Sequence, residues 1–295
     1  SWHNHVSGDH YTISEAWLDR VQEVLDYAVD DDMYVILNIH HDTDKEYCYP
    51  DKEHLEQSLS YMTFIWEQLA DRFGDYDEHV IFESINEPRL VETDHEWWLD
   101  MNAAECVEAV ECINEWNQNF VDVVRKTGGN NATRYLMVPG YDASADGVLN
   151  DKFVLPTDTA ENEGKILVSV HAYIPYHFAL QAATENESID QFNASEKTST
   201  NDIDQMMEKL YAKYISNEIP VVIGEFGARD KNGNLQSRVD YAAYYIAAAR
   251  AYGMSCNWWD NNAFTGDGEL FGQLDRKTVT WRYPKIVDAL MKYAE

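Results

Sequence analysis

The sequence predicts an α/β fold in which parallel strands alternate with amphipathic helices. Short runs rich in Val, Ile and Leu alternate with longer segments whose apolar residues recur at helical spacing. The runs are apolar at consecutive positions, as strands buried on both faces are. The segments that follow the runs are long, whereas those that lead into the next run are short. With 45% apolar and 13% aromatic residues, the 295-residue chain can bury one large core.

Six strands are predicted, at 33–39, 79–85, 134–138, 165–170, 220–224 and 254–258. Helices are predicted between them, for example over 17–28 and 59–73, where apolar side chains follow the helical period. Ser14 is expected to cap the first helix, and Gly74, Gly128 and Gly253 are expected to end three others in the left-handed conformation.

The unequal connections favour a (β/α)8 TIM barrel. Turns from helix to strand are short (74–78, 128–133, 217–219), and connections from strand to helix are long (40–52, 86–111, 171–201). Such barrels carry their active sites on the long connections at the carboxyl ends of the strands, although a doubly wound open sheet has the same asymmetry. Six strands are fewer than a closed barrel needs. We therefore expect residues 1–295 to form a single catalytic barrel domain that lacks its first strand, its first helix and most of its second strand. A chain of these residues alone is expected to be unstable or inactive.

The composition excludes several classes of partner. The 22 basic and 53 acidic residues give a formal charge of -31, which repels nucleic acid and anionic membranes but suits a neutral polymer. No run has the length and apolar character of a membrane helix, and no leader sequence is visible. Sequons at Asn131, Asn186 and Asn193 lead us to expect a secreted, extracellular glycoprotein.

The four cysteines lack the paired spacing of a zinc site, so we expect no metal and no other cofactor. Cys106 and Cys112 could form a disulfide across one loop, and the sequence leaves their pairing open.

Polar residues end five of the predicted strands. The carboxyl ends of parallel strands meet on one face of the sheet, so we expect these side chains to form one site. They are Asn38, His40, His41 and Asp42; Asn86 and Glu87; His171 and Tyr173; Glu225; and Trp259, Asp260 and Asn261.

Two carboxylates, Glu87 and Glu225, each directly follow an apolar run. Hydrolysis of a glycosidic bond uses such a pair, because a protonated carboxyl donates to the leaving oxygen while a carboxylate attacks or stabilises the anomeric carbon. Asn86 can hydrogen-bond the sugar 2-hydroxyl, an interaction that strengthens in the transition state. Tyr173 can hold Glu225 as an oriented anion, and His171 can help to set the protonation of the pair. These neighbours favour Glu87 as acid/base and Glu225 as the ionised partner.

Sugar rings present apolar faces, so a polysaccharide site also needs aromatic platforms. Trp259 is the main candidate, and Trp258 is expected to turn into the wall. Further candidates are Trp2, Trp97, Trp98, Tyr47 and Tyr49, while the cluster His3, Asn4 and His5 and the segment 174–201 are expected to shape distant subsites.

These motifs resemble glycoside hydrolase family 5, a retaining family of (β/α)8 barrels. Asn-Glu-Pro at 86–88, His-Ala-Tyr at 171–173 and Gly-Glu-Phe-Gly at 224–227 occur in the family's order. The strings ILNIHHD at 36–42 and WWDN at 258–261 are similar to endoglucanases of rumen bacteria and anaerobic fungi. The resemblance extends over essentially the whole chain.

The resemblance implies a retaining endo-β-1,4-glucanase in which Glu87 is the acid/base and Glu225 the nucleophile that forms a covalent glycosyl-enzyme. It also implies an arginine on an earlier strand that holds the nucleophile ionised, and no residue of this chain takes that place. The implied partner is a β-1,4-linked glucan. Its cleavage subsite is implied to be lined by Asn86, His40, His41, His171, Tyr173 and Trp259, and we add Trp2, His5 and Asn261 as candidate contacts.

Three alternatives stay open. A metal-dependent hydrolase could use His40, His41, His171 and Glu225 as ligands, although the sequence has no HxH or HExxH spacing. A non-catalytic β-glucan-binding protein would keep the cleft without turnover. A hemicellulase of the same family, such as a xyloglucanase, xylanase or mannanase, would differ in its loops. We expect endo action and a monomer, to which docking or binding modules outside this chain can be attached.

Overall fold

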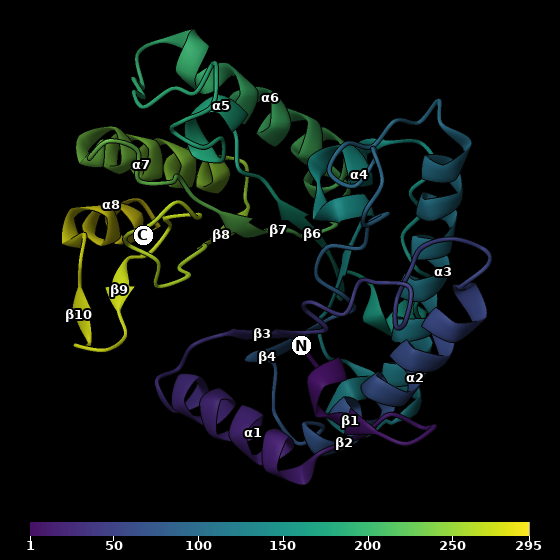
Figure 1. Ribbon diagram of the computed structural model, residues 1–295. Coiled ribbons are helices and arrows are strands. Elements are labelled where there is room, and N and C mark those ends of the chain that lie inside the picture. The colour runs from purple at the N-terminus through teal and green to yellow at the C-terminus, as the bar shows by residue number, and fades with distance from the viewer. Residues whose placement is uncertain (295) are drawn as a thin grey trace. The chain divides into compact units, whose positions relative to one another are not determined.

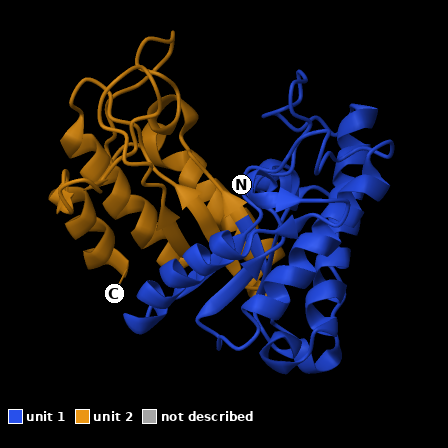
Figure 2. Cartoon of the chain, turned by 60° about the horizontal axis from the view of Figure 1, so that its bottom comes forward, with its two compact units in different colours: residues 1–169 blue, residues 170–295 orange. Residues whose placement is uncertain are grey.

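The computed structural model describes residues 1–294, which divide into two compact units (Figure 1). Unit 1 comprises Ser1–Ser169 and unit 2 comprises Val170–Glu295, drawn in blue and orange in Figure 2. The expectation of a single domain stays a prediction.

Unit 1 is built from parallel strands that alternate with helices. Strands β3, β4, β5 and β6 are neighbours in chain order, with Val35 opposite Val80, Phe82 opposite Leu136, and Leu136 opposite Ile166. The elements are η1 (His3–His5), β1 (Val6–Ser7), β2 (Thr12–Ile13), α1 (Glu15–Asp30), β3 (Val35–Asn38), α2 (Leu55–Arg72), β4 (Val80–Glu83), α3 (Ala104–Lys126), η2 (Gly129–Ala132), β5 (Leu136–Pro139), η3 (Tyr141–Ala143), α4 (Ala145–Leu149), η4 (Ala160–Asn162) and β6 (Ile166–His171), whose last residues belong to unit 2.

Unit 2 continues the same alternation. Strands β7 and β8 are parallel, and their register is irregular between Ile223 and Phe226. The elements are α5 (Tyr176–Ala179), α6 (Lys197–Lys213), η5 (Ile215–Asn217), β7 (Val221–Phe226), α7 (Leu235–Ala251), β8 (Ser255–Trp258), the hairpin β9 (Leu274–Asp275) and β10 (Thr280–Trp281), and α8 (Pro284–Ala294).

All six predicted strands are present, with differences at their ends. Strand β7 continues to Phe226, so Glu225 lies within the strand rather than after it. The ladder extends that far because the Ala172 amide donates to the Glu225 carbonyl at 2.9 Å. Strand β4 ends at Glu83, which leaves Glu87 on the following loop.

Buried aromatic rings organise the core of each unit. In unit 1, the Trp66 ring lies 5.3 Å from Phe82 and 4.6 Å from Phe120, and its indole N–H donates to the Ser84 carbonyl at 2.9 Å. In unit 2, Phe226 stacks on Tyr245 with ring centroids 4.3 Å apart. Packing therefore fixes β4, which precedes Glu87, and β7, which contains Glu225.

A buried arginine holds the turn that leads into β4. The Arg134 guanidinium donates to the carbonyls of Tyr76 and Val80, both at 2.6 Å. Burial lowers the pKa of Arg134 to about 10. Asn131 is buried beside it and accepts from Arg134 Nε at 2.7 Å, so this sequon is not accessible in the folded chain, whereas Asn186 and Asn193 are exposed.

Two expectations about helix ends are corrected. Gly128 and Gly253 have the predicted left-handed backbone, but Gly74 does not. Gly74 is needed for another reason, because a Cβ at this position would lie only 2.7 Å from the Ala70 carbonyl oxygen. Ser14 occupies the N-cap of α1 but makes no capping hydrogen bond with its side chain.

The structure answers the question that the sequence left open for Cys106 and Cys112. Cys106 and Cys112 lie within α3 rather than at the ends of a loop, and both are buried free thiols. A separation of six residues turns their side chains to different sides of a helix. Within residues 1–294, none of the helices combines the length and apolar character needed to cross a membrane.

Candidate active site

Glu225 is held at both its backbone and its side chain. The Tyr173 hydroxyl donates to Glu225 Oε2 at 2.6 Å, and His171 Nδ1 lies 3.7 Å from the same oxygen. The Glu225 side chain is 12% exposed, so it is reachable but mostly desolvated. A phenol that donates to a carboxylate stabilises its ionised form. This is the contact that the sequence predicted for Tyr173.

Packing in unit 2 holds Tyr173 and Glu225 in place. The Tyr173 ring lies 5.3 Å from the fully buried ring of Phe271. Gly227 allows Phe271 to approach, because a Cβ there would lie 3.1 Å from the Phe271 ring. The Tyr245 hydroxyl donates to the Ala172 carbonyl at 3.1 Å, which fixes the strand end between His171 and Tyr173. Phe271 was not predicted, because the sequence places it far from either strand.

The last residue of β8 and the residues after it comprise a half-buried pair, Trp258 and Trp259, and a loop anchor, Asn261. The Trp259 amide donates to the Phe226 carbonyl at 2.8 Å, which places Trp259 beside the end of β7. The Trp258 indole turns inward, 5.4 Å from the Phe226 ring, as expected. Asn261 uses both ends of its amide within its own loop, because Nδ2 donates to the Glu269 carbonyl at 2.7 Å and Oδ1 accepts from the Ala263 amide at 3.0 Å. These bonds favour a loop role for Asn261 over the predicted sugar contact.

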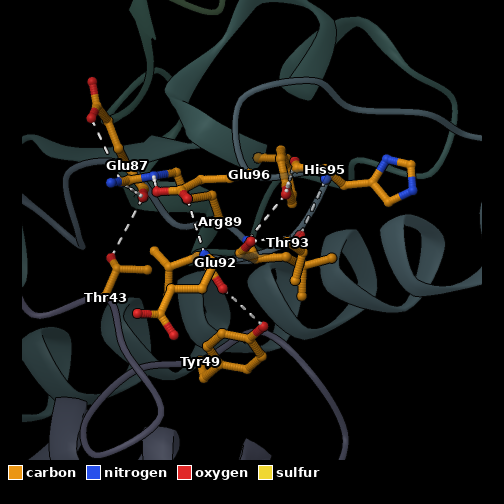
Figure 3. Close-up of polar contacts among 11 residues, drawn as sticks. Thr43, Tyr49, Glu87, Arg89, Glu92, Thr93, His95 and Glu96 are labelled. Atoms are coloured by element: carbon orange, nitrogen blue, oxygen red, sulfur yellow. Dashed lines mark hydrogen bonds and ion pairs between the residues drawn. The ribbon is translucent and has the colours of Figure 1, made fainter.

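Glu87 in unit 1 lies on the loop after β4, with its side chain 19% exposed (Figure 3). Arg89 donates to the Glu87 backbone carbonyl at 2.9 Å, and its guanidinium lies 3.7 Å from Glu87 Oε2. Arg89 is itself fixed, since it donates to Glu96 at 3.3 Å and stacks on the half-exposed Trp97 ring at 3.9 Å. A fixed cation at this distance favours the ionised form of Glu87. No pattern in the sequence marks Arg89 as part of the site.

Asn86 ends a buried polar network that runs through unit 1. Asn38 Nδ2 donates to Asn86 Oδ1 at 3.4 Å and to Glu83 Oε2 at 2.8 Å. Ser169 Oγ donates to the other oxygen of Glu83 at 2.5 Å. Glu83 is 2% exposed and was missed by the sequence analysis. Its one signal was a charged residue inside the apolar run VIFESI.

The two neighbouring histidines of unit 1 contact each other. The rings of His40 and His41 lie 4.3 Å apart at an angle of 82°, and His40 Nδ1 is 3.5 Å from Asn38 Nδ2. Desolvation by its surroundings lowers the pKa of His41 below its usual value.

Two residues from the start of the chain do not present open faces. Trp2 is 5% exposed, and its indole N–H donates to the Asn38 carbonyl at 2.8 Å. This burial argues against the platform role predicted for Trp2. The His5 ring stacks on Trp17 at 3.7 Å, so the structure gives His5 an intramolecular partner.

The predicted site residues thus form two groups, one in each unit. Unit 1 holds Trp2, His5, His40, His41, Asn86 and Glu87, and unit 2 holds Tyr173, Glu225, Trp259, Asn261 and His171, the last residue of β6.

Comparison with known proteins relates both groups to one family. Residues 1–265 match the model of the cellulase family, glycosyl hydrolase family 5. Endoglucanase B of Ruminococcus albus is 42% identical over 295 residues, which are all of this chain and 67% of that protein.

Two solved structures are similar over nearly the whole chain. The glycoside hydrolase 5 lichenase of Caldicellulosiruptor sp. F32, as a mutant in complex with cellotetraose, gives a TM-score of 0.98 at 59% identity, covering 100% of this chain and 79% of that one. A broad-specificity endoglucanase of Ruminococcus champanellensis with bound cellotriose gives 0.88 at 44% identity, covering 99% and 80%. These matches confirm the predicted (β/α)8 fold class. The chain is therefore a glycoside hydrolase that belongs to the cellulase family, glycosyl hydrolase family 5.

Proposed function

We propose that the chain is a retaining endo-β-1,4-glucanase that cleaves internal bonds of cellulose and related β-glucans. The family and the endoglucanase and lichenase names of its relatives support this proposal. The observation that carries it is the hydrogen bond from Tyr173 to Glu225 at 2.6 Å, since an oriented, ionised carboxylate at a strand end is what a glycosidase nucleophile requires.

In the first step, Glu225 attacks the anomeric carbon and forms a glycosyl ester, while Glu87 gives its proton to the leaving glycosidic oxygen. The hydroxyl of Tyr173 holds Oε2 of Glu225 and so orients the carboxylate for this attack. Asn86 hydrogen-bonds the 2-hydroxyl of the sugar as the ring gains oxocarbenium character.

In the second step, Glu87 takes a proton from water, which attacks the glycosyl ester and releases a product with the original β configuration. Arg89 favours this step, because its guanidinium stabilises the ionised form of Glu87 that acts as base, at the expense of the protonated form that acts in the first step.

Chemical rescue by azide separates the two carboxylate roles. With an activated aryl β-cellobioside, Glu225→Gly is expected to give an α-glycosyl azide, because azide then attacks in place of the nucleophile. Glu87→Ala is expected to give a β-glycosyl azide, because azide then replaces water in the second step. The opposite pairing of products, or no azide product from either folded variant, would refute the assignment.

Three assays address the alternatives. A non-catalytic glucan-binding protein would bind cello-oligosaccharides without releasing reducing ends. A metal-dependent hydrolase would lose activity on dialysis against a chelator and regain it with zinc. A product profile on cellulose, mixed-linkage glucan, xyloglucan, xylan and mannan identifies the preferred polymer.

We also propose that the protein is secreted and acts outside the cell as a monomer. Expression in a host that glycosylates secreted proteins should give glycans at Asn186 and Asn193 and none at the buried Asn131. A glycan found at Asn131 on folded protein would contradict the buried environment described above.

A further inference from the structure

A chain of hydrogen bonds, buried at Ser169, Glu83 and Asn86 and partly buried at Asn38, ends at the amide that we assign to the sugar 2-hydroxyl. It runs from Ser169 through Glu83 and Asn38 to Asn86, entirely within unit 1. Glu83 and Asn86 are 2% and 3% exposed, so solvent does not compete for these groups. Hydrophobic residues occupy the rest of β4, and a carboxylate among them is costly to bury unless it has a task.

The chemistry of the side chains determines which group donates and which accepts in this series of hydrogen bonds. An ionised carboxylate only accepts hydrogen bonds, so Asn38 must turn its NH2 group toward Glu83 Oε2, 2.8 Å away. The same nitrogen has a second hydrogen, which faces Asn86 Oδ1 at 3.4 Å, with His40 Nδ1 also nearby at 3.5 Å. Asn86 therefore turns its carbonyl oxygen inward and leaves its NH2 group to donate elsewhere.

The backbones at both asparagines are anchored independently of their side chains. The Asn86 amide donates to the Ile39 carbonyl at 2.8 Å, and the Trp2 indole donates to the Asn38 carbonyl at 2.8 Å. These bonds fix where the two amide groups lie but not which way each is turned. The hydrogen-bond partners of each side chain decide which way its amide group is turned. Among these partners, an ionised Glu83 can only accept hydrogen bonds.

We propose that Glu83 is a positioning residue that sets the orientation of Asn38 and, through it, makes Asn86 present its N–H group to the 2-hydroxyl of the sugar. This inference rests on the proposed function. It adds a residue that governs how Asn86 contacts the sugar 2-hydroxyl in the transition state. Glu83 acts on Asn86 through the bond that it accepts from Asn38.

The test compares two substrates on four enzymes. The substrates are an aryl β-cellobioside and its analogue without the 2-hydroxyl on the ring that bears the aryl group. The enzymes are the wild type, Glu83→Gln, Asn38→Ala and the control Ser169→Ala. Because both substrates are used with every enzyme, their intrinsic reactivities cancel when the ratios of kcat/KM are compared.

In the wild type, removal of the 2-hydroxyl is expected to lower kcat/KM by about 100-fold or more. In Glu83→Gln the ratio is expected to fall below about 10-fold, because glutamine can donate as well as accept and no longer fixes the amides. Asn38→Ala interrupts the chain at its middle and should give the same loss, which keeps the proposal testable if Glu83→Gln does not fold. Ser169→Ala leaves the bond between Asn38 and Glu83 in place and should keep the wild-type ratio.

A wild-type ratio in folded Glu83→Gln and Asn38→Ala would overturn the role of Glu83 while leaving the proposed function intact. A wild-type enzyme that cleaves neither substrate would instead overturn the proposed function and this inference with it. A reduced ratio in both variants, with thermal unfolding close to that of Ser169→Ala, supports the proposal in a way that general destabilisation does not.

Discussion

Replacing Tyr173 with phenylalanine removes one donor from Glu225 and changes little else. The hydroxyl lies 2.6 Å from Glu225 Oε2, whereas the ring packs 5.3 Å from Phe271, a contact that phenylalanine retains. The Glu225 backbone stays fixed by the Ala172 amide at 2.9 Å. Tyr173→Phe therefore tests the hydrogen bond itself.

The size of the effect follows from the bond that is lost. A hydrogen bond to a charged group contributes about 1.5–3 kcal/mol. If that stabilisation is needed to keep the nucleophile ionised and aligned, kcat/KM should fall by about 10- to 150-fold. His171 remains 3.7 Å from the same oxygen and limits the loss.

The pH dependence of kcat/KM distinguishes this account from a general structural defect. Removal of the donor weakens the ionised form of Glu225, so the acidic limb of the profile should move to higher pH. Tyr244→Phe is a matched control, since its hydroxyl donates to Asp204 at 2.6 Å away from the predicted site residues. The reasoning fails if Tyr173→Phe keeps both the rate and the acidic limb of the wild type.

Three further predictions concern stability. Arg134→Met leaves several buried carbonyls without a donor and should lower the free energy of unfolding, measured in urea, by about 3 kcal/mol or more. The control Arg72→Met removes an ion pair whose arginine side chain is 30% exposed and should lower it by less than about 1 kcal/mol. Equal losses of stability would contradict the role of burial. Burial lowers the pKa of Lys231 to about 8 from a usual 10.5, so the unfolded chain binds more protons than the folded chain between these pH values. The stability of the wild type relative to Lys231→Met should therefore rise by up to about 3 kcal/mol from pH 8 to about pH 10. A fall in relative stability over this range would contradict the lowered pKa. Gly74→Ala forces a Cβ to 2.7 Å from a backbone oxygen and should lower the melting temperature, whereas Gly268→Ala meets open space and should not; similar melting temperatures would argue against the close approach.

The sequence predicted β4, β5 and β6 well, because strands buried on both faces have a continuous apolar pattern. The expected burial on both faces is wrong for β8, in which Ser255 and Asn257 are exposed. The sequence analysis placed the end of β7 too early, because the ladder continues through the polar Glu225 by a backbone bond from Ala172. It read residues 86–111 as one connection, although α3 begins at Ala104. Helix ends depend on loop packing, which local patterns record weakly.

The candidate site was predictable where residue type alone limits the partner. A tyrosine at the end of one strand and a glutamate at the end of the next led to the contact that the structure contains. Glu83 was not predictable, because its partners Asn38 and Ser169 come together only through the register of four strands. Trp2 was misjudged because exposure depends on the fold around a residue and not on its type.

The central claim is that Glu225 attacks the sugar and carries it as a covalent ester. The most direct measurement is mass spectrometry of peptides from enzyme inactivated with an activated aryl 2-deoxy-2-fluoro-β-cellobioside. The fluorine slows both steps, and the good aryl leaving group speeds only the first, so the glycosyl ester accumulates. The account predicts a fluorocellobiosyl label on Glu225. A label on any other residue, or complete turnover of the parent cellobioside to the α-anomer without a label, would contradict it.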